Sequence, residues 1–355
     1  MTVLLFAGGL ALLLVGAEIL VRGSSAIAAA AGVSPLIVGL TIVAFGTSSP
    51  ELAVSVKSAL DGQAGIAVGN VVGSNIFNVL FILGVSALLA PLVVSQRLVR
   101  LDVPLMIALS VAVLMLSLDG TFGRIDGLLM MACLIAYLAF LFRQSRSEGA
   151  EIREEYAREF GSDVRSRAGW MINIVLVVGG LTLLVIGSRL LVGTATAFAT
   201  ALGVSELVVG LTIVAAGTSL PEVVTSIVAA IRGERDIAVG NVVGSNLFNI
   251  MGVLGVAAVV APRGIAITPA VIGFDLPVMI VVAWACLPIF FTGNVISRSE
   301  GVLLLAYYVA YTSYLVLAAS QHDALPRFSA VMLYFAIPLT VFVLIVVAAR
   351  ETRRQ

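Results

Sequence analysis

The sequence predicts an all-α polytopic membrane protein in which five transmembrane helices are followed by five more of inverted topology and by one extra span. The 355-residue chain is 60% hydrophobic and only 11% charged, whereas roughly a quarter of the residues in a soluble domain are charged. Apolar runs of about 20 residues, enough to cross a ~30 Å hydrocarbon core, recur from end to end. A polar motif inside these runs occurs twice, 171 positions apart.

The apolar runs predict about eleven spans. We expect them at residues 2–22, 33–60, 66–90, 101–118, 125–143, 170–193, 204–231, 237–261, 270–292, 299–319 and 329–349. The spans divide the chain into a first five-span repeat (1–143), a polar loop (144–169), a second repeat (170–320), and an extra helix with a tail (321–355).

The topology follows from the odd number of spans in each repeat. Five spans leave the chain on the opposite side of the membrane, so the second repeat is inverted about a pseudo-two-fold axis in the membrane plane. With the N-terminus outside, fifteen of the 20 lysine and arginine residues fall on the cytoplasmic side, as the positive-inside rule requires. The loop 144–168 and the C-terminus are then cytoplasmic.

Charged residues near the span ends have structural interpretations. Asp102 and Asp275 each stand two residues before a proline, a pattern typical of a helix start, so we interpret them as helix caps. Glu18 and Arg22 are four residues apart, the spacing of an ion pair on one helix face. A surface ion pair and a contact that gates the ion path are both open for them.

The repeated motif places polar groups at membrane depth. Residues 33–84 align without a gap with residues 204–255, and about 32 of the 52 pairs are identical. Its first half, Val-Gly-Leu-Thr-Ile-Val-Ala-x-Gly-Thr-Ser-x-Pro-Glu, ends at Glu51 and Glu222, and its second half, Ile-Ala-Val-Gly-Asn-Val-Val-Gly-Ser-Asn-x-Phe-Asn, ends at Asn78 and Asn249. Polar groups at this depth are costly, so they indicate an ion or substrate path.

The first half of the motif predicts a broken helix. Pro50 and Pro221 lack an N–H group and their rings crowd the preceding turn, while the nearby Gly46 and Gly217 lower helix stability. We expect a kink that frees carbonyl oxygens around residues 44–47. Irregular backbone of this kind is tolerated in a membrane only where it lines a cavity or is buried in protein.

The polar groups of both copies are oxygen ligands. Serine and asparagine are four residues apart in each second half, which places their side chains on one helix face. No histidine or cysteine belongs to the set, so transition metals that prefer these ligands are disfavoured. Two carboxylates with neutral oxygens suit Ca²⁺, which takes six to eight oxygens at ~2.3–2.6 Å, or several Na⁺ ions. A single membrane glutamate could be a protonated packing residue, but two copies with matching spacings indicate a site.

These residues resemble the α-repeats of the sodium/calcium exchangers, in the calcium/cation antiporter superfamily. Both α-repeats match, and the ten-span inverted architecture that the resemblance implies covers roughly residues 1–320. Span 329–349 is additional to the ten spans typical of the compact prokaryotic members that this chain resembles. The resemblance assigns the Ca²⁺ carboxylates to Glu51 and Glu222 and places Asn78 and Asn249 at the central position. The other ligands that it implies are Thr47, Thr218, Ser48, Ser219, Ser74, Ser245 and the carbonyls of Ala44 and Ala215.

The resemblance implies electrogenic antiport of Na⁺ for Ca²⁺ by alternating access, in the plasma membrane of a prokaryote. Many similar exchangers, including K⁺-dependent ones, have Asp where this chain has Asn249, so transport without K⁺ is expected. The expected partners are Ca²⁺, Na⁺ and the lipid bilayer. No cofactor is expected, and the chain has no basic patch with interleaved aromatics for nucleic acid. The sequence does not determine the oligomeric state.

Other functions stay open on the same residues. A Ca²⁺/H⁺ antiporter could use the two glutamates to carry protons, and a cation channel could use the same oxygens. The broken helices of an inverted repeat favour a carrier over a pore. An intramembrane hydrolase is disfavoured, because the sole histidine, His322, lies in a connector and no HExxH motif is present, so the chain is not expected to be an enzyme.

Overall fold

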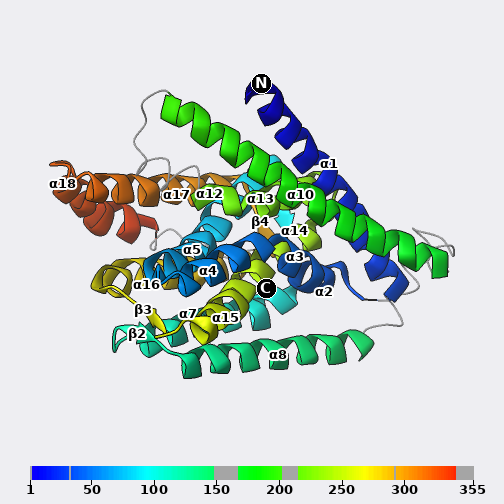
Figure 1. Ribbon diagram of the computed structural model, residues 1–355, viewed down its shortest axis with the longest axis horizontal. Helices are drawn as coiled ribbons and strands as arrows, with labels where there is room; N and C mark the ends of the chain where they lie inside the picture. Colours follow the sequence, from blue (N-terminus) through cyan, green and yellow to red (C-terminus); the bar gives the residue numbers. More distant parts are fainter. Residues whose placement is uncertain (1, 32, 148–166, 202–214, 292, 341–355) are drawn as a thin grey trace.

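Two long helices cross one face of a helical body in the computed structural model (Figure 1). Helix α1 (Thr2–Ala31) and helix α10 (Arg167–Ala201) lie side by side, and each is the first helix of its repeat. The structure describes residues 2–31, 33–147, 167–201, 215–291 and 293–340.

The elements after α1 and after α10 follow the same order. After α1 come α2 (Pro35–Val38), the π-helical turn η1 (Gly39–Val43), α3 (Ala44–Thr47), α4 (Ser49–Leu60), α5 (Ala64–Phe77), η2 (Asn78–Ile82), α6 (Leu83–Leu89), β1 (Leu92–Val93), η3 (Leu98–Asp102), α7 (Val103–Leu116), β2 (Thr121–Phe122) and α8 (Arg124–Ser147). After α10 come α12 (Ala215–Thr218), α13 (Leu220–Ile231), α14 (Arg235–Phe248), η6 (Asn249–Leu254), α15 (Gly255–Val260), β3 (Ile265–Ala266), η7 (Val271–Asp275), α16 (Leu276–Phe291), β4 (Val295–Ile296), α17 (Arg298–Ala319), α18 (Leu325–Val331) and η8 (Met332–Ala336).

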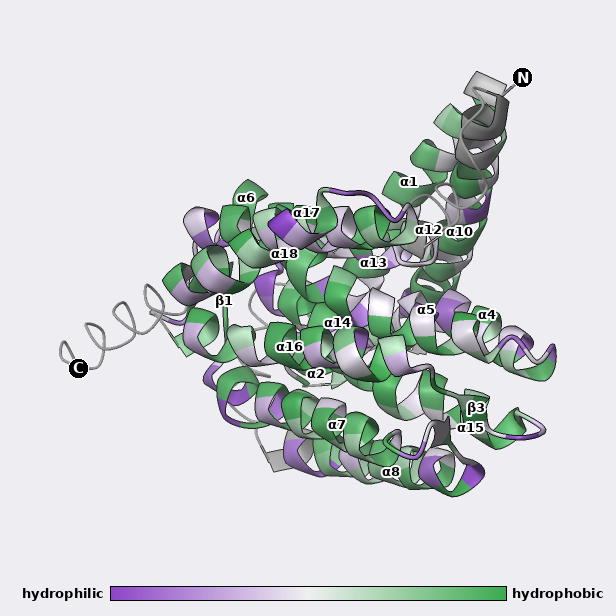
Figure 2. Ribbon diagram, turned by 90° about the vertical axis from the view of Figure 1, so that its left-hand side faces the viewer, coloured by the Kyte–Doolittle hydropathy of each residue, from purple (hydrophilic) through white to green (hydrophobic). Residues whose placement is uncertain are grey.

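The helices have the length and composition of membrane spans. Eight described helices pass this test, and the broken helix Pro35–Thr47 with Ser49–Leu60 is a ninth. Hydrophobic residues cover the outer helices (Figure 2). The prediction of an all-helical membrane protein is confirmed. Spans 204–231 and 329–349 extend into residues 202–214 and 341–355, which lie outside the described residues, so the count of eleven stays a prediction.

The two long helices exceed the spans expected from the sequence. Helix α1 continues nine residues past Arg22 to Ala31, and α10 begins at Arg167 and ends at Ala201. The expected span ended at Arg22 because a charge there lowers local hydropathy. The following Gly-Ser-Ser-Ala-Ile-Ala-Ala-Ala-Ala segment contains no proline or charge that would end a helix.

The second half of the repeated motif forms the centre of the molecule. The continuous helices α5–η2–α6 and α14–η6–α15 are the most buried spans. Within an apolar stretch of 18 residues, 78% of the first helix and 89% of the second are buried, against 39% or less in the other complete spans. Helix α14 contacts α2, η1 and α3 of the first repeat. A Cβ added at Gly244 would lie 2.7 Å from the Leu40 Cα, so this close approach of the two repeats requires glycine.

Reciprocal contacts show that the two repeats are inverted. A Cβ at Gly16 would lie 2.9 Å from the Gly180 carbonyl oxygen, and a Cβ at Gly9 would lie 3.0 Å from that of Gly187. Because the earlier residue of α1 meets the later residue of α10, the two equivalent helices are antiparallel. The short strands agree, since β1 pairs with β4 and its counterpart β3 pairs with β2.

The interpretation of Asp102 and Asp275 as helix caps is wrong. Within the described residues, neither side chain accepts a hydrogen bond from the backbone of the helix that follows. Asp102 accepts one from the Tyr137 hydroxyl at 2.9 Å, and Asp275 accepts one from that of Tyr311 at 3.1 Å. The carboxylates therefore fasten one helix to another, a tertiary role that local sequence does not reveal.

Candidate functional site

A helix break stands at the equivalent point of both repeats. Helix α3 ends at Thr47 and α4 begins at Ser49, with a bend of 46° between them. Ser48, between the two, has φ −80° and ψ 6°, and Ser219 has φ −88° and ψ 8° between α12 and α13. The predicted break is confirmed. Proline stands in the first turn of each following helix, where its missing N–H is no loss.

The break places each glutamate at a helix N-terminus. Glu51 lies in the first turn of α4 and Glu222 in the first turn of α13. The partial positive charge of a helix N-terminus stabilises a carboxylate there. The expectation that the Ala44 carbonyl is freed by the break is wrong, because this carbonyl still accepts a hydrogen bond from the Ser48 amide at 3.0 Å. The Thr47 hydroxyl also donates to that oxygen, at 3.4 Å.

The two carboxylates are buried and bound by the opposite repeat. Glu51 is 1% exposed and Glu222 is fully buried. The Ser219 hydroxyl donates to Glu51 Oε1 at 2.7 Å, and the Ser48 hydroxyl donates to Glu222 Oε1 at 2.9 Å. One oxygen of each carboxylate is thus bound by the other repeat.

No cationic side chain balances these carboxylates in the described part of the chain, where the ion pairs involve other acids. Burying an unpaired charge costs so much free energy that the group neutralises instead. The site therefore needs a cation or a proton at each carboxylate.

Four acceptor oxygens at the centre have no hydrogen-bond donor among the described residues. They are Oε2 of Glu51, Oε2 of Glu222, Oδ1 of Asn78 and Oδ1 of Asn249. Buried acceptors are rarely left without a partner, because their desolvation is then uncompensated. Each repeat contributes the same two atoms, so these four oxygens suit a cation held between the repeats.

The asparagines of this set begin π-helical turns. Asn78 opens η2 and Asn249 opens η6, and both side chains are buried. Such turns inside α-helices frequently occur at functional sites. The Asn249 amide donates to the Ser74 hydroxyl at 3.0 Å, while the buried Ser245 hydroxyl has no partner among the described residues. The predicted asparagine of the second repeat therefore contacts the predicted serine of the first repeat.

The predicted threonines contact two asparagines that sequence reasoning missed. The Thr47 hydroxyl donates to Asn241 Oδ1 at 3.1 Å, and Thr218 lies 3.5 Å from Asn70 Oδ1. The two asparagines share a pattern. The Asn70 amide donates to the Glu51 carbonyl (3.0 Å) and the Ser55 hydroxyl (2.9 Å), and the Asn241 amide donates to the Glu222 carbonyl (3.4 Å) and the Ser226 hydroxyl (2.9 Å).

These bonds tie the helix that carries each glutamate to the helix that follows it. The signal was present, because Asn70 and Asn241 are identical positions of the repeated motif. Ala215, a predicted carbonyl ligand, is the first residue of α12.

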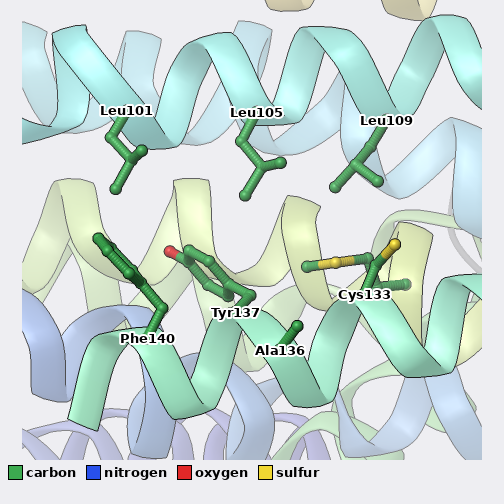
Figure 3. A pocket seen from close by; sticks show the side chains of 8 residues that line it. Leu101, Leu105, Leu109, Cys133, Ala136, Tyr137 and Phe140 are labelled. Carbon is green, nitrogen blue, oxygen red and sulfur yellow. The ribbon is translucent and has the colours of Figure 1, made fainter. Parts of the chain in front are cut away.

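A cavity elsewhere does not share this chemistry. It has a volume of about 310 Å³ and lies between α7 and α8 (Figure 3). Leucines of one helix face Cys133, Ala136, Tyr137 and Phe140 of the other, so the lining is mostly apolar. In the described residues, no group of three or more His, Cys, Asp or Glu side chains gathers. The centre with two carboxylates is therefore the candidate ion site.

The fold and site define a membrane carrier built from two inverted repeats, with a candidate ion site at their interface. The family model "Sodium/calcium exchanger protein" matches residues 1–143 and 172–317. The chain therefore belongs to the sodium/calcium exchanger protein family.

Individual proteins agree with this membership. The chain is 38% identical to CaxA of Alkalimonas amylolytica over 308 residues, 85% of this chain and 95% of that one. It is 34% identical to the sodium/calcium exchanger MaX1 of Methanosarcina acetivorans over 286 residues, 72% of this chain and 81% of that one. A solved structure of the sodium-calcium exchanger NCX_Mj superposes with a TM-score of 0.76 at 30% identity, covering 88% of this chain and 97% of that one. Family membership and this likeness support antiport of Ca²⁺ against another cation.

Proposed function

We propose that the protein exchanges Na⁺ for Ca²⁺ by alternating access at the centre between the repeats. The observation that carries this proposal is the set of four buried oxygens that have no hydrogen-bond donor among the described residues. Two of them belong to the carboxylates, whose charges no described cationic side chain balances, and two belong to the asparagines. One Ca²⁺ between Glu51 and Glu222 would balance both charges, with Asn78 and Asn249 supplying neutral oxygens. MaX1 and NCX_Mj are both named sodium/calcium exchangers, which supports Na⁺ as the counter-ion.

Thr47 and Thr218 would supply backbone and hydroxyl oxygens to the bound ions. The remaining predicted ligands would serve Na⁺: Ser48, Ser219, Ser74, Ser245 and the carbonyls of Ala44 and Ala215. Binding of one set of ions draws on the same two carboxylates as the other, so the two sets compete. Three Na⁺ per Ca²⁺ would move one net charge, worth about 2.3 kcal/mol per 100 mV.

The proposal extends to orientation and selectivity. We place the N-terminus outside and the loop 144–168 and the C-terminus in the cytoplasm of a prokaryotic cell, on the strength of the arginine distribution. Asn249, which adds no third carboxylate to the centre, supports transport that is independent of K⁺.

Uptake of ⁴⁵Ca²⁺ into proteoliposomes tests the exchange. Vesicles loaded with Na⁺ are expected to take up Ca²⁺ when Na⁺ is absent outside, and Glu51→Gln is expected to abolish this uptake. Asp323→Asn, a change at an exposed acid far along the chain, is the control and should transport normally. Uptake that follows only an imposed pH gradient would make the protein a Ca²⁺/H⁺ antiporter. Single-channel currents in planar bilayers would instead indicate a channel.

A further inference from the structure

A second pair of asparagines lies beside the central pair. Asn75 and Asn246 are each 2% exposed and stand three residues before Asn78 and Asn249. The Asn75 amide nitrogen lies 3.5 Å from the Asn246 carbonyl oxygen, and the Asn246 amide nitrogen lies 3.3 Å from the Asn75 carbonyl oxygen. The two residues thus clasp each other across the pseudo-two-fold axis.

These contacts determine which way the side-chain amides of Asn75 and Asn246 point. Besides the backbone carbonyl, the Asn75 amide nitrogen contacts the Met279 sulfur at 3.6 Å, and the Asn246 amide nitrogen contacts the Met106 sulfur at 3.5 Å. With both amide nitrogens engaged, the side-chain oxygens of Asn75 and Asn246 are left to face the central asparagines.

Those oxygens bind the central amides. The Asn78 amide donates to Asn246 Oδ1 at 3.0 Å, and the Asn249 amide donates to Asn75 Oδ1 at 3.3 Å. A carboxamide has its donor on one side and its acceptor on the other. Fixing the nitrogen of Asn78 or Asn249 therefore directs the oxygen away from the clasp, and both oxygens are the buried acceptors without a donor.

We propose that Asn75 and Asn246 are positioning residues, which keep the carbonyl oxygens of Asn249 and Asn78 turned toward the transported cation. This inference rests on the proposed function. A flipped central amide would present N–H groups to the cation and repel it. The arrangement also requires a donor at position 249, because a carboxylate there would face the Asn75 oxygen. It thus gives a structural reason for Asn249 in this chain.

The test combines Asn246→Leu with Asn78→Ala and measures the KM for Ca²⁺ in proteoliposomes. Asn246→Leu is expected to raise the KM by roughly 10-fold or more, the usual effect of losing an outer-sphere partner of a metal ligand. Asn78→Ala, which removes the ligand itself, should raise it at least as much. The double variant should match Asn78→Ala alone, because Asn246 acts only through Asn78. Asn75→Leu with Asn249→Ala is the mirror experiment, which serves if the first set does not fold.

Two other outcomes separate the inference from the proposed function. If Asn246→Leu raises the KM further in the Asn78→Ala background, its effect is general to the fold and the positioning role is overturned. If Asn78→Ala leaves the KM unchanged, the central site itself is wrong, and both proposals fail.

A different observation concerns charges at the ends of the repeats. The offset of 171 that relates the repeats aligns Glu18 with Arg189 and Asp61 with Arg232. Each acid of one repeat thus corresponds to an arginine of the other. By the pseudo-two-fold relation, a contact between Glu18 and Arg232 has as its equivalent a contact between Arg189 and Asp61.

The structure forms one of these contacts. The Arg232 guanidinium binds the Glu18 carboxylate, which joins α1 to the end of α13, and α1 packs along α13. Among the described residues, the equivalent ion pair is not formed, since Asp61 pairs with Lys57 at 2.7 Å. Helix α10 makes no comparable contact with α4. The two ends of the molecule therefore differ, as they would in a carrier closed on one side.

We infer that Glu18–Arg232 and Arg189–Asp61 are alternate latches, one formed in each conformation of the transport cycle. In inverted-repeat carriers, one part rocks against the other around the fixed site, which exchanges the states of the two ends. This inference rests on alternating access but not on the identity of the counter-ion.

Cross-linking tests the latches in a background with Cys133→Ser and Cys286→Ala. One variant carries Glu18→Cys with Arg232→Cys, a second carries Asp61→Cys with Arg189→Cys, and a third carries all four changes. The cross-linker is a bifunctional thiol-reactive reagent whose spacer matches the length of the glutamate and arginine side chains that it replaces. It is expected to block ⁴⁵Ca²⁺ exchange in each two-cysteine variant.

Intact mass of the four-cysteine variant decides between the outcomes. Each molecule should carry a single bridge, at one latch or the other. Molecules with both bridges would show that the contacts coexist, which would overturn the inference. So would free exchange in a fully cross-linked two-cysteine variant.

Discussion

Gly16→Ala probes the contact between α1 and α10. A Cβ at this position would lie 2.9 Å from both the Gly180 carbonyl oxygen and the Leu184 amide nitrogen, and 3.0 Å from the Leu183 Cβ. Ordinary contacts begin at 3.4 Å, so the helices must separate by at least about 0.5 Å where they cross. Overpacking of this kind costs about 1–3 kcal/mol. The higher helix propensity of alanine returns up to ~1 kcal/mol.

The control is Gly8→Ala on the same helix. No described atom lies within 4 Å of a Cβ there, so only the propensity gain of up to ~1 kcal/mol applies. The two variants should therefore differ by about 1–3 kcal/mol in stability, with Gly8→Ala the more stable. Thermal unfolding of both proteins in one detergent measures the difference, and ⁴⁵Ca²⁺ exchange measures the effect on transport.

If α1 and α10 slide past each other during transport, exchange should be slower in Gly16→Ala. The added methyl group would clash with the backbone of α10 and hinder this movement. Equal stability and equal exchange rates for Gly16→Ala and Gly8→Ala would refute the reasoning. The helices would then have enough freedom at this crossing to accept a side chain.

Three further predictions concern the charged residues and the transported ions. Glu51→Gln or Glu222→Gln should abolish ⁴⁵Ca²⁺ uptake without unfolding the protein, since a carboxamide oxygen still accepts the serine hydroxyl; full activity in either would remove the site assignment. Arg97→Gln should lower the melting temperature, because it removes the partner 3.5 Å from the buried Asp102 and an unpaired buried charge costs about 3–5 kcal/mol; an unchanged melting curve would contradict this. Replacing external K⁺ by a large organic cation should leave uptake unchanged, and a requirement for K⁺ would overturn the argument from Asn249.

The sequence was sufficient for features that depend on neighbouring residues. The helix break follows from Pro50 and Gly46 alone, and the burial of Ser74 and Asn78 on one helix face follows from helical spacing. Duplication made both predictions specific, because the same polar pattern recurs at Glu222 and Asn249. The all-helical membrane fold followed from hydropathy for the same local reason.

Features that depend on packing between the repeats were not predictable from one sequence. Nothing local indicates that Ser219 binds Glu51 rather than the glutamate of its own repeat. The helix-cap interpretation of Asp102 failed because its partner, Tyr137, lies on another helix. Asn70 and Asn241 were missed although they belong to the motif, because their role lies in hydrogen bonds to the next helix and not in ligating an ion.

The distribution of hydrogen bonds indicates which parts of the molecule can move. Each carboxylate at the centre is held by a serine of the other repeat, and the asparagine clasp crosses the same axis. Separating the repeats there would break several buried hydrogen bonds at once, each costly to leave unmade. By contrast, α1 and α10 meet through glycines and apolar side chains. If the protein works by alternating access, a movement in which α1 and α10 slide past each other while the centre stays intact would break fewer buried hydrogen bonds than separating the repeats, and ions would reach one fixed set of oxygens from both sides.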